Sequence, residues 1–551
     1  MESIDSASHS TENAPTYAPI TTEDHDQERP RPISKTASRG STIIERSWSL
    51  NDGYSVAGGD DDENENEQTE KPGNGVAASD TEIVVKWDEN DPENPRNMSW
   101  GRRWLITVFI ALGSICVTCT SSMYVMTYKQ ITKEFGCSNE VATVGLTTYI
   151  FGLGIGPLFL APLSEFYGRR RIYLVSFTFF VIWMIPCAVA QNIQTMLVVR
   201  FFSGLSGAAF LSVAGGTVGD MFNRHELAAP MMLYTASPFL GPEIGPLVGG
   251  FINQYTTWRW TFYTLLIWAG VQLAILFFFV PETYHPVLLK RKAARLRQET
   301  GDNRYIAPLE KMKKSVVETV LRSCYRPMLL LTLEPMCACL CVYSAILLGI
   351  LYLFFGAFNM VFSTVYDFNQ WQTGASFLGI LVGMICAILS DPLWRRNYRR
   401  LESNHMKAVG EKGEAMPEWR LPPAIGGAPF VTVGIFMFAW TTYPHVHWIV
   451  CVVGTAFFGA GVVLVYSGIF TFLVDAYPEF AASALAANSF ARSTFGGVFP
   501  LFGTQMYDRL GIHWASSLLA FLTLLMLPFP YIFFRYGKDI RKKSKFATSF
   551  T

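Results

Sequence analysis

The sequence has few charged residues and no excess of either sign. Aspartate, glutamate, lysine and arginine make up 16% of the 551 residues, and 44 basic side chains balance 44 acidic ones. No basic face for binding nucleic acid is therefore indicated. Half of the residues are hydrophobic, and this proportion is typical of a membrane protein.

The ten cysteines do not indicate a disulfide framework. Most of them lie within apolar runs, where a thiol behaves as a small hydrophobic group. Cys337, Cys339 and Cys341 alternate along the chain, and in a helix this spacing spreads their side chains around the axis. We therefore expect no metal site at these residues.

The signatures of an enzyme or of an ATP-driven pump are also missing. The sequence has no phosphate-binding GxxxxGK[ST] loop and no apparent pair of nucleophile and base, so we expect a protein that is not an enzyme and has no cofactor. Residues 1–98 lack the charged and apolar parts of a cleavable signal peptide. They are rich in polar and acidic residues and too poor in apolar ones to form a core, which predicts a disordered cytoplasmic tail.

Long apolar runs dominate the rest of the chain. Twelve of them are near the length that crosses a bilayer, about twenty residues at a rise of about 1.5 Å each. We predict an all-α membrane protein with spans at 104–125, 141–163, 172–190, 194–217, 229–252, 260–280, 329–355, 371–390, 424–442, 447–472, 481–504 and 514–534.

The longest interruption divides these spans into two sets of six, which is the internal symmetry of a two-bundle transporter. The predicted parts are a first six-helix bundle over 99–280, a cytoplasmic central loop over 281–327, a second six-helix bundle over 328–536 and a basic cytoplasmic tail over 537–551. Lysine and arginine gather in the loops after even-numbered spans and in the last tail. Because such residues mark the cytoplasmic side, we expect both termini in the cytoplasm.

The fifth predicted span contains a repeated glycine pattern, SPFLGPEIGPLVGGFI, over residues 237–252. Glycines at every fourth position share one helix face, and such a face lets another helix approach closely. The prolines between them should bend the helix. The residues that carry this pattern are Gly241, Pro242, Gly245, Pro246, Gly249 and Gly250.

A charged motif, APLSEFYGRRR, follows the second span over residues 161–171. Gly168 permits a tight turn, and Arg169 and Arg170 can reach a carboxylate on a neighbouring helix. Asp220, at the end of the fourth span, is the expected partner, and Glu165 lies at the end of the second. Such a cluster can hold one conformation and open in another, although plain anchoring of the arginines on the cytoplasmic side is an alternative.

The second half contains an echo of this motif, SDPLWRRNYRR, over residues 390–400. Asp391 corresponds to Glu165 in this alignment, and two arginines follow it at a similar distance. Internal duplication explains the echo. We therefore include Asp391 among the residues of the predicted conformational switch.

Two ionisable residues lie within the apolar spans of the first half. Arg200, in the fourth span, is costly in hydrocarbon and should face the bundle interior and pair with another group. Glu243 lies within the glycine pattern and is a candidate proton carrier near Arg200. A structural pair or a carboxylate at headgroup level remains an alternative for Glu243.

Polar and aromatic residues of several spans form a candidate substrate site. Arg492 and Asn488 follow a face of small residues in the eleventh span, where polar side chains can face an aqueous cavity. Aromatic walls with a few polar tips suit a broad apolar or cationic ligand. The candidate residues are Tyr234, Tyr343, Tyr352, Phe355, Tyr466, Asn488 and Arg492.

Several of these motifs together resemble the major facilitator superfamily. Within it, the chain is similar to the twelve-span fungal drug:proton antiporters, which include multidrug and polyamine exporters. The resemblance covers residue 87 to the end and rests on LVVRFFSGLSGAA around Arg200, on APLSEFYGRR, on GPEIGPLVGG and on the segment 474–502. Gly356 stands where many fungal relatives have glutamate, which weakens the expectation of a polyamine-type substrate.

The resemblance implies proton-coupled export of small amphipathic compounds, such as antifungal drugs or toxic metabolites, across the plasma membrane. It places Arg200 on the arginine implicated in proton coupling. The expected partners are a small-molecule substrate, protons and the lipid bilayer, and the protein is expected to be a monomer that uses a proton gradient. A polyamine or other solute transporter of the same fold and a membrane sensor without transport remain alternatives.

Overall fold

The computed structural model describes residues 83–88, 91–223, 226–311, 315–409, 416–542, 544, 546 and 547. These residues all fall within one compact unit. Most of the expected N-terminal tail (1–82, 89 and 90) and the last four residues of the predicted C-terminal tail lie outside them. The described part is almost entirely helical.

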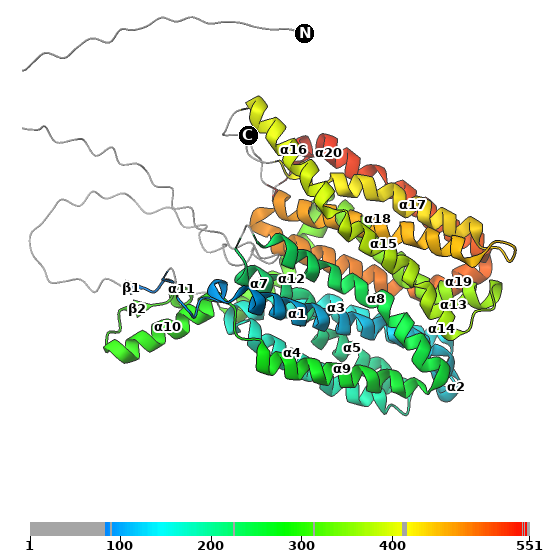
Figure 1. Cartoon of the computed structure of the whole chain (residues 1–551), viewed down its shortest axis with the longest axis horizontal. Helices are drawn as coiled ribbons and strands as arrows, with labels where there is room; N and C mark the ends of the chain where they lie inside the picture. The colour runs from blue at the N-terminus through cyan, green and yellow to red at the C-terminus, as the bar shows by residue number, and fades with distance from the viewer. Residues whose placement is uncertain are drawn as a thin grey trace, which may run out of the picture. The chain divides into compact units, whose positions relative to one another are not determined.

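The first bundle is drawn from blue to green in Figure 1. Because the apolar runs are long enough to cross a bilayer, each forms one helix or a stack of shorter helices. The helices are α1 (Trp100–Met123), α2 (Tyr128–Phe135), α3 (Asn139–Tyr167), α4 (Arg169–Ala188), α5 (Ile193–Gly207), α6 (Ala209–Ser212), α7 (Ala214–Met221), α8 (Ala228–Tyr255) and α9 (Trp258–Phe279). The short helix η3 (Tyr124–Thr127) joins α1 to α2, and α5 to α7 together form the fourth span.

The second bundle runs from yellow-green to red in Figure 1. Its helices are α13 (Pro335–Val365), α14 (Gln370–Ser376), α15 (Leu378–Leu389), α16 (Asp391–Val409), α17 (Pro422–Thr441), α18 (Trp448–Ala476), α19 (Ala481–Met526) and α20 (Pro528–Arg541). The helix α19 is interrupted at Gly511, which has φ 75° and ψ 164°. The two parts of α19 therefore form the eleventh and twelfth spans.

Length and hydropathy alone identify ten membrane-spanning candidates among the described residues. The proline-containing helix α8 is not one of the ten, and a single candidate covers Pro478–Arg541. Counting α8 and dividing that long run at Gly511 gives the twelve helices in two bundles of six that the sequence predicts.

The seventh span begins later than the sequence suggests. Residues 329–333 belong to α12 (Val316–Leu333), which ends at Glu334 with φ −110° and ψ 95°. The proline ring of Pro335 favours an extended residue before it and starts a new helix well. The expected central loop also contains helices, α10 (His285–Thr300) and α11 (Pro308–Lys311), in addition to the first part of α12.

Residues 83–88 and 91–98, which we call the pre-span segment, are ordered rather than disordered as expected. The strand β1 (Ile83–Val84) pairs in parallel with β2 (Tyr305–Ile306), and η2 (Pro95–Asn97) leads into α1. The indole of Trp87 donates a hydrogen bond of 3.0 Å to Nδ1 of His285. Val85 is buried, and Trp87 partly buried, in a small cluster with residues of α10, which supplies the core that this short stretch lacks by itself.

The glycine face of α8 lies against α1. A Cβ added at Gly241 would be 1.9 Å from Oγ1 of Thr118, and one added at Gly245 would be 1.9 Å from Oγ of Ser122. A side chain at either position would have to displace the facing hydroxyl and would crowd the backbone of α1. The predicted close approach is therefore present, and α1 is the partner helix.

Candidate functional site

A cavity of about 180 Å³ lies between the two bundles. The first bundle contributes residues of α1, α3, α6, α7 and α8, and the second contributes residues of α13, α18 and α19. Its lining includes Gly215 of α7, Tyr234 near the start of α8 and Ala482 at the start of α19. These positions place the cavity toward the end of the bundles where α10 lies, which we call the α10 end (Figure 1).

The opposite end, which carries α2 and α14, is closed by direct contact between the bundles. A Cβ added at Gly374 of α14 would lie 2.3 Å from the carbonyl oxygen of Pro246 in α8. The rings of Phe251 and Trp371 stack with centroids 5.3 Å apart. Deeper in the molecule, Oγ1 of Thr147 in α3 donates a 2.7 Å hydrogen bond to the carbonyl oxygen of Gly497 in α19. We call this side the α14 end.

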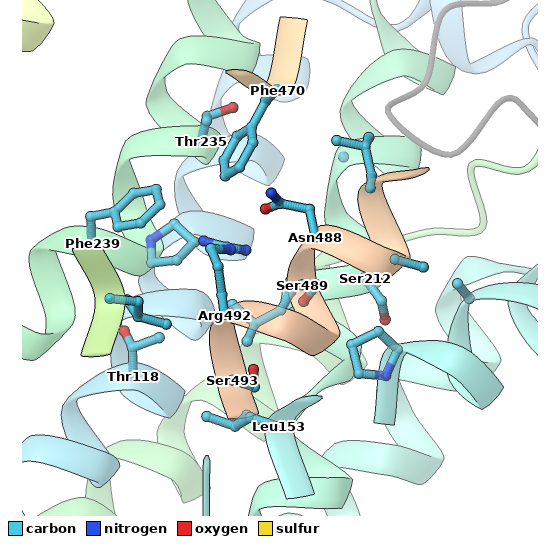
Figure 2. Close-up of a pocket in the computed structure, with 18 of the residues that line it drawn as sticks. Thr118, Leu153, Ser212, Thr235, Phe239, Phe470, Asn488, Ser489, Arg492 and Ser493 are labelled. Carbon is cyan, nitrogen blue, oxygen red and sulfur yellow. The ribbon is translucent and has the colours of Figure 1, made fainter. Parts of the chain in front are cut away.

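Arg492 is the charged side chain of the cavity. Its guanidinium carbon lies 4.9 Å from the ring centre of Phe470, 5.5 Å from that of Tyr466 and 5.8 Å from that of Phe239. Its Nε is buried and has no hydrogen-bond partner. Figure 2 shows the guanidinium in the cavity between Phe239 and Asn488. Arg492 therefore contacts π faces and retains free hydrogen-bonding capacity.

An aromatic stack forms the wall beside Arg492. Tyr466 stacks on Phe239, with ring centroids 4.9 Å apart, and on Phe470, with centroids 5.6 Å apart. Neither phenylalanine was among the residues that we expected from the sequence. Phe470 lies four residues after Tyr466, so the helical period could have placed both on one face of α18.

The seven expected substrate residues are divided by the structure. Tyr234, Tyr352, Asn488 and Arg492 line the cavity, whereas Tyr343, Phe355 and Tyr466 lie outside its lining. The hydroxyl of Tyr466 donates to the carbonyl oxygen of Ser344 at 3.1 Å. Tyr466 therefore supports the rings that line the cavity without lining it. Whether a residue lines the cavity or supports it depends on the rotation of its helix, which a single sequence does not show.

Glu243 is fully buried in α8, with 0% of its surface exposed. Neither of its carboxylate oxygens has a hydrogen-bond partner. An ionised carboxylate without donors is costly in a membrane interior, so this arrangement favours the protonated side chain. Tyr352 lies within electrostatic range of both Glu243 and Arg492, and its hydroxyl lies 3.0 Å from Oγ of Ser121. Tyr352 also lines the cavity, so it is close to both the buried carboxyl and the cavity.

Arg200 is held by backbone and aromatic groups of three neighbouring segments. Its Nε donates to the carbonyl oxygen of Gly145 at 2.7 Å, and one terminal nitrogen donates to that of Thr120 at 3.4 Å. Its guanidinium carbon lies 3.8 Å from the ring centre of Tyr124. The expected interior position is present, but no ion pair between Arg200 and Glu243 occurs among the described residues.

The α10 end of the first bundle contains the expected charge cluster. Nε of Arg169 lies 3.2 Å from Oδ2 of Asp220, and both side chains are buried. Arg169 also donates to Oγ of Ser164 at 2.6 Å, and Glu165 lies within its electrostatic range. Arg170 instead donates to the carbonyl oxygen of Phe277 at 2.7 Å. Of the two arginines, Arg169 therefore links α4 to α7.

Glu282 completes this cluster and was missed at the sequence level. Its Oε1 accepts a 2.8 Å hydrogen bond from the backbone amide of Arg169, and its Oε2 accepts one of 3.3 Å from that of Arg170. A carboxylate in this position satisfies free amides at the start of α4 and complements the helix dipole. A single acidic residue directly after the last apolar span of the bundle was the available signal.

Gly168 connects α3 to α4 with φ +92°. A Cβ at this position would lie 2.3 Å from Oε2 of Glu282. The tight turn predicted for Gly168 is therefore present, and the contact with Glu282 is a second reason for glycine.

The echo motif of the second half has a different geometry. Asp391 forms an ion pair with Arg395, one turn along the same helix. It does not join two helices as Asp220 does, because α15 continues almost directly into α16 without a turn like that at Gly168. In this bundle, Arg420 of η4 (Pro417–Arg420) instead pairs with Asp475 of α18 at 2.6 Å.

Comparison with known proteins gives consistent matches over most of the chain. The model of the Major Facilitator Superfamily matches residues 110–500. The chain is 56% identical over 470 residues to "Efflux pump atB" of Aspergillus terreus, covering 85% of this chain and 91% of that protein. It is 43% identical to the "Probable drug/proton antiporter YHK8" of Saccharomyces cerevisiae, with 85% and 90% covered.

Solved structures show the same fold at low sequence identity. The xylose transporter XylE from E. coli, in a partially occluded inward open conformation, aligns with a TM-score of 0.56 and 17% identity over 79% of this chain and 98% of that one. The human organic anion transporter MFSD10 aligns with a TM-score of 0.54 and 15% identity over 79% of this chain and 100% of that one. At this identity, the comparison shows only that the fold is the same.

Proposed function

This chain belongs to the major facilitator superfamily, and from that premise we propose that it exports small amphipathic compounds from the cell in exchange for protons. The observation that carries the proposal is the cavity between the bundles, which is closed at the α14 end and holds Arg492. Binding between two repeats and alternate opening of the two ends is how such folds move a solute. The names of the relatives, an efflux pump and a probable drug/proton antiporter, support the direction and the coupling.

The α10 end is the cytoplasmic side in this proposal. Arg169, Arg170 and the basic helix α10 lie at that end, whereas the α14 end carries few basic residues. Lysine and arginine mark the cytoplasmic side of membrane proteins. On this proposal the conformation is inward-facing and both chain ends lie in the cytoplasm, and we also propose that the membrane is the plasma membrane.

Glu243 is the proton carrier in this proposal. In the inward-facing state its carboxyl is buried without donors, so it is protonated, and release of that proton to the cytoplasm creates a charge that must gain a partner or water. Tyr352 connects this change to the cavity. Arg200, on α5, contacts α1 and α3, and α1 also packs against the glycine face of α8, the helix that carries Glu243.

The alternatives have less support. A polyamine carries several positive charges and would need carboxylates, yet none occurs among the described residues that line the cavity. A sensor without transport would not need a cavity between two bundles that are in direct contact at one end. The cavity therefore favours transport of a compound other than a polyamine.

The proposal is tested in inside-out vesicles from cells that produce the full-length protein. We expect accumulation of a fluorescent aromatic drug to stop when a protonophore collapses the proton gradient. Glu243→Gln, which fixes the neutral form, should fold normally but lose at least about 90% of gradient-driven accumulation, because proton exchange at a positioned carboxyl is removed.

The control for this variant is Glu226→Gln, which removes a half-exposed carboxylate that pairs with Arg103 at 2.7 Å, outside the cavity. This control should retain most of the accumulation. Accumulation that persists without a proton gradient would contradict antiport, and full coupling in Glu243→Gln would remove Glu243 from the mechanism.

A further inference from the structure

Among the described residues, the cavity lining carries a positive charge and no negative one. Among the described residues that line it, Arg492 is the ionic one, and the remaining polar groups are hydroxyls and the amide of Asn488. Arg492 is half-buried, and a partly desolvated cation without a counter-ion is unfavourable in a membrane protein. The guanidinium therefore needs a negative partner, and the described residues that line the cavity do not supply one.

The π faces around Arg492 are already occupied. Phe239, Tyr466 and Phe470 each lie within 6 Å of its guanidinium carbon. A cationic ligand would have to displace Arg492 from these rings and would also be repelled by its charge. Our expectation from the sequence that the aromatic wall suits a cationic ligand is therefore not supported by the geometry.

We propose that the cavity selects small planar aromatic anions, such as aromatic carboxylates, with Arg492 as their counter-ion. This inference rests on the proposed role of the cavity as the transport site and names its substrate class. Guanidinium and carboxylate form paired, charge-assisted hydrogen bonds. The unpartnered Nε of Arg492 is available for one of them.

The rest of the lining fits the remaining parts of such a ligand. Phe239 and Phe470 flank Arg492 in the cavity lining and can pack against an aromatic body with their ring edges. The hydroxyls of Ser489 and Ser493 lie on the same helix beside Arg492 (Figure 2) and can donate to a second anionic oxygen. The free Oδ1 of Asn488 can accept from a ring hydroxyl.

The volume limits the size of the ligand. A cavity of about 180 Å³ is smaller than the roughly 300–1,000 Å³ of drug-sized sites. One ring or two fused rings with a single carboxylate is the size that fits this conformation.

The test measures binding to the purified full-length protein in lipid nanodiscs without any ion gradient. The probes are 2-naphthoate, 2-naphthamide and 2-naphthylmethylammonium, which share one ring system and differ in charge. We expect naphthoate to bind at least about tenfold more tightly than the amide, because the charged pair forms in a desolvated site. The ammonium compound should bind most weakly.

Variants of Arg492 test whether the charge of its guanidinium, rather than the shape of the cavity, determines the preference for the anion. Arg492→Gln should weaken naphthoate binding at least about tenfold and change binding of the amide by less than about threefold. Arg492→Lys should still prefer the anion but bind it more weakly, because lysine keeps the charge but cannot donate two parallel hydrogen bonds to a carboxylate. The matched control is Arg509→Gln, which removes an exposed arginine of the same helix outside the cavity and should leave all three affinities unchanged.

Each possible result decides the inference. Equal binding of naphthoate and its amide, tighter binding of the ammonium compound, no binding of naphthoate, or an anion preference that survives in Arg492→Gln would overturn it. If Arg492→Gln does not fold, the order of the three probes on the unchanged protein and on Arg492→Lys gives the answer. Because no gradient is present, failure of proton-coupled transport would leave this binding order intact, so the two proposals fail separately.

Discussion

At the scale of single residues, the charge cluster of the first bundle depends on one positive φ angle. Gly168 lets the chain turn between α3 and α4, and this turn brings the first amides of α4 to the carboxylate of Glu282. Arg169 is then directed at Asp220. One residue without a side chain thus determines both the capping of α4 and the ion pair between α4 and α7.

The substitution Gly168→Ala should therefore destabilise the protein by about 1–3 kcal/mol, because alanine at φ +92° is strained and its Cβ would overlap the carboxylate of Glu282. The measurement is denaturant or thermal unfolding of the purified protein. Gly101→Ala is the control, since no atom lies within 4 Å of a Cβ at that position, and its effect should stay within about 0.5 kcal/mol. Equal effects of the two substitutions would contradict the role given to the turn.

At the scale of elements, the pre-span segment is attached to α10 by apolar, polar and ionic contacts. Val85 is buried with Leu289 and Ala293 in a small separate core. Nζ of Lys292 lies 2.6 Å from Oδ2 of Asp91. Because α10 follows the sixth span directly, this attachment connects the entrance of the first span to the exit of the last span of the same bundle.

His285 makes this attachment sensitive to pH. Its Nδ1 accepts from Trp87, so its Nε2 carries the proton and donates to the carbonyl oxygen of Asp220 at 2.8 Å. Burial, together with the charges of Arg96 and Arg169, lowers the pKa of His285 to about 4, against the opposing effect of the hydrogen bond to the carbonyl oxygen of Asp220. Protonation would remove the acceptor that Trp87 uses.

The sign of the pH dependence follows from these values. The detached histidine takes up a proton near pH 6.5, whereas the attached one does so only near pH 4. The attachment is therefore most stable above pH 6.5, weakens as the pH falls from 6.5 toward 4 and changes little below that. Between pH 7.5 and 5, we expect opening of the pre-span segment to become about thirtyfold more frequent.

Hydrogen exchange of the peptide over residues 83–98, corrected for the intrinsic pH dependence of exchange, measures this opening. His285→Gln is the matched variant, because glutamine can accept from Trp87 but does not titrate. It should show no such pH dependence. A pH dependence that is the same in the variant and in the unchanged protein would mean that another group titrates.

Elements with strong local signals could be predicted from the sequence, and the others depend on tertiary contacts. Twelve apolar runs gave the spans because a bilayer requires a minimum length of apolar chain. The glycine face of α8 was equally readable, because its period is local. The pre-span segment was not, since its few apolar residues become stable only against α10. The motif of Asp391 repeats the residues of the first half but not the turn that directs them, and the place of Asp391 in a conformational switch stays a prediction.

The candidate site was predictable in its residue types but not in its geometry. Arg492 and Asn488 were identified because polar side chains within an apolar span are costly and need a function. That Arg492 lies over Phe239 and Phe470, and so occupies the π faces, depends on how α8, α18 and α19 rotate against one another. Periodicity within one helix carries no information on that rotation.

At the scale of the whole molecule, the two ends of the bundles differ in what holds them. The α14 end is held by backbone in direct contact, as at Gly374 and Pro246, and by the stacked rings of Phe251 and Trp371. The cavity lies toward the α10 end. Since packed interfaces have discrete alternative arrangements, opening one end requires separation of the contacts at that end.

Gly374→Ala should therefore prevent full closure of the α14 end. The added Cβ would lie 2.3 Å from a backbone oxygen of Pro246, and a backbone atom cannot move aside as the end of a flexible side chain can. Alanine is a better helix former than glycine by about 1 kcal/mol, so a loss of function cannot come from α14 itself. We expect export to fall at least about tenfold and the distance between spin labels at Tyr255 and Thr364 to increase.

Gly356→Ala is the control in the same bundle, because the nearest atom to its Cβ, Oγ1 of Thr504, is 4.0 Å away. Normal export and an unchanged label distance in Gly374→Ala would show that this contact does not determine which end is open.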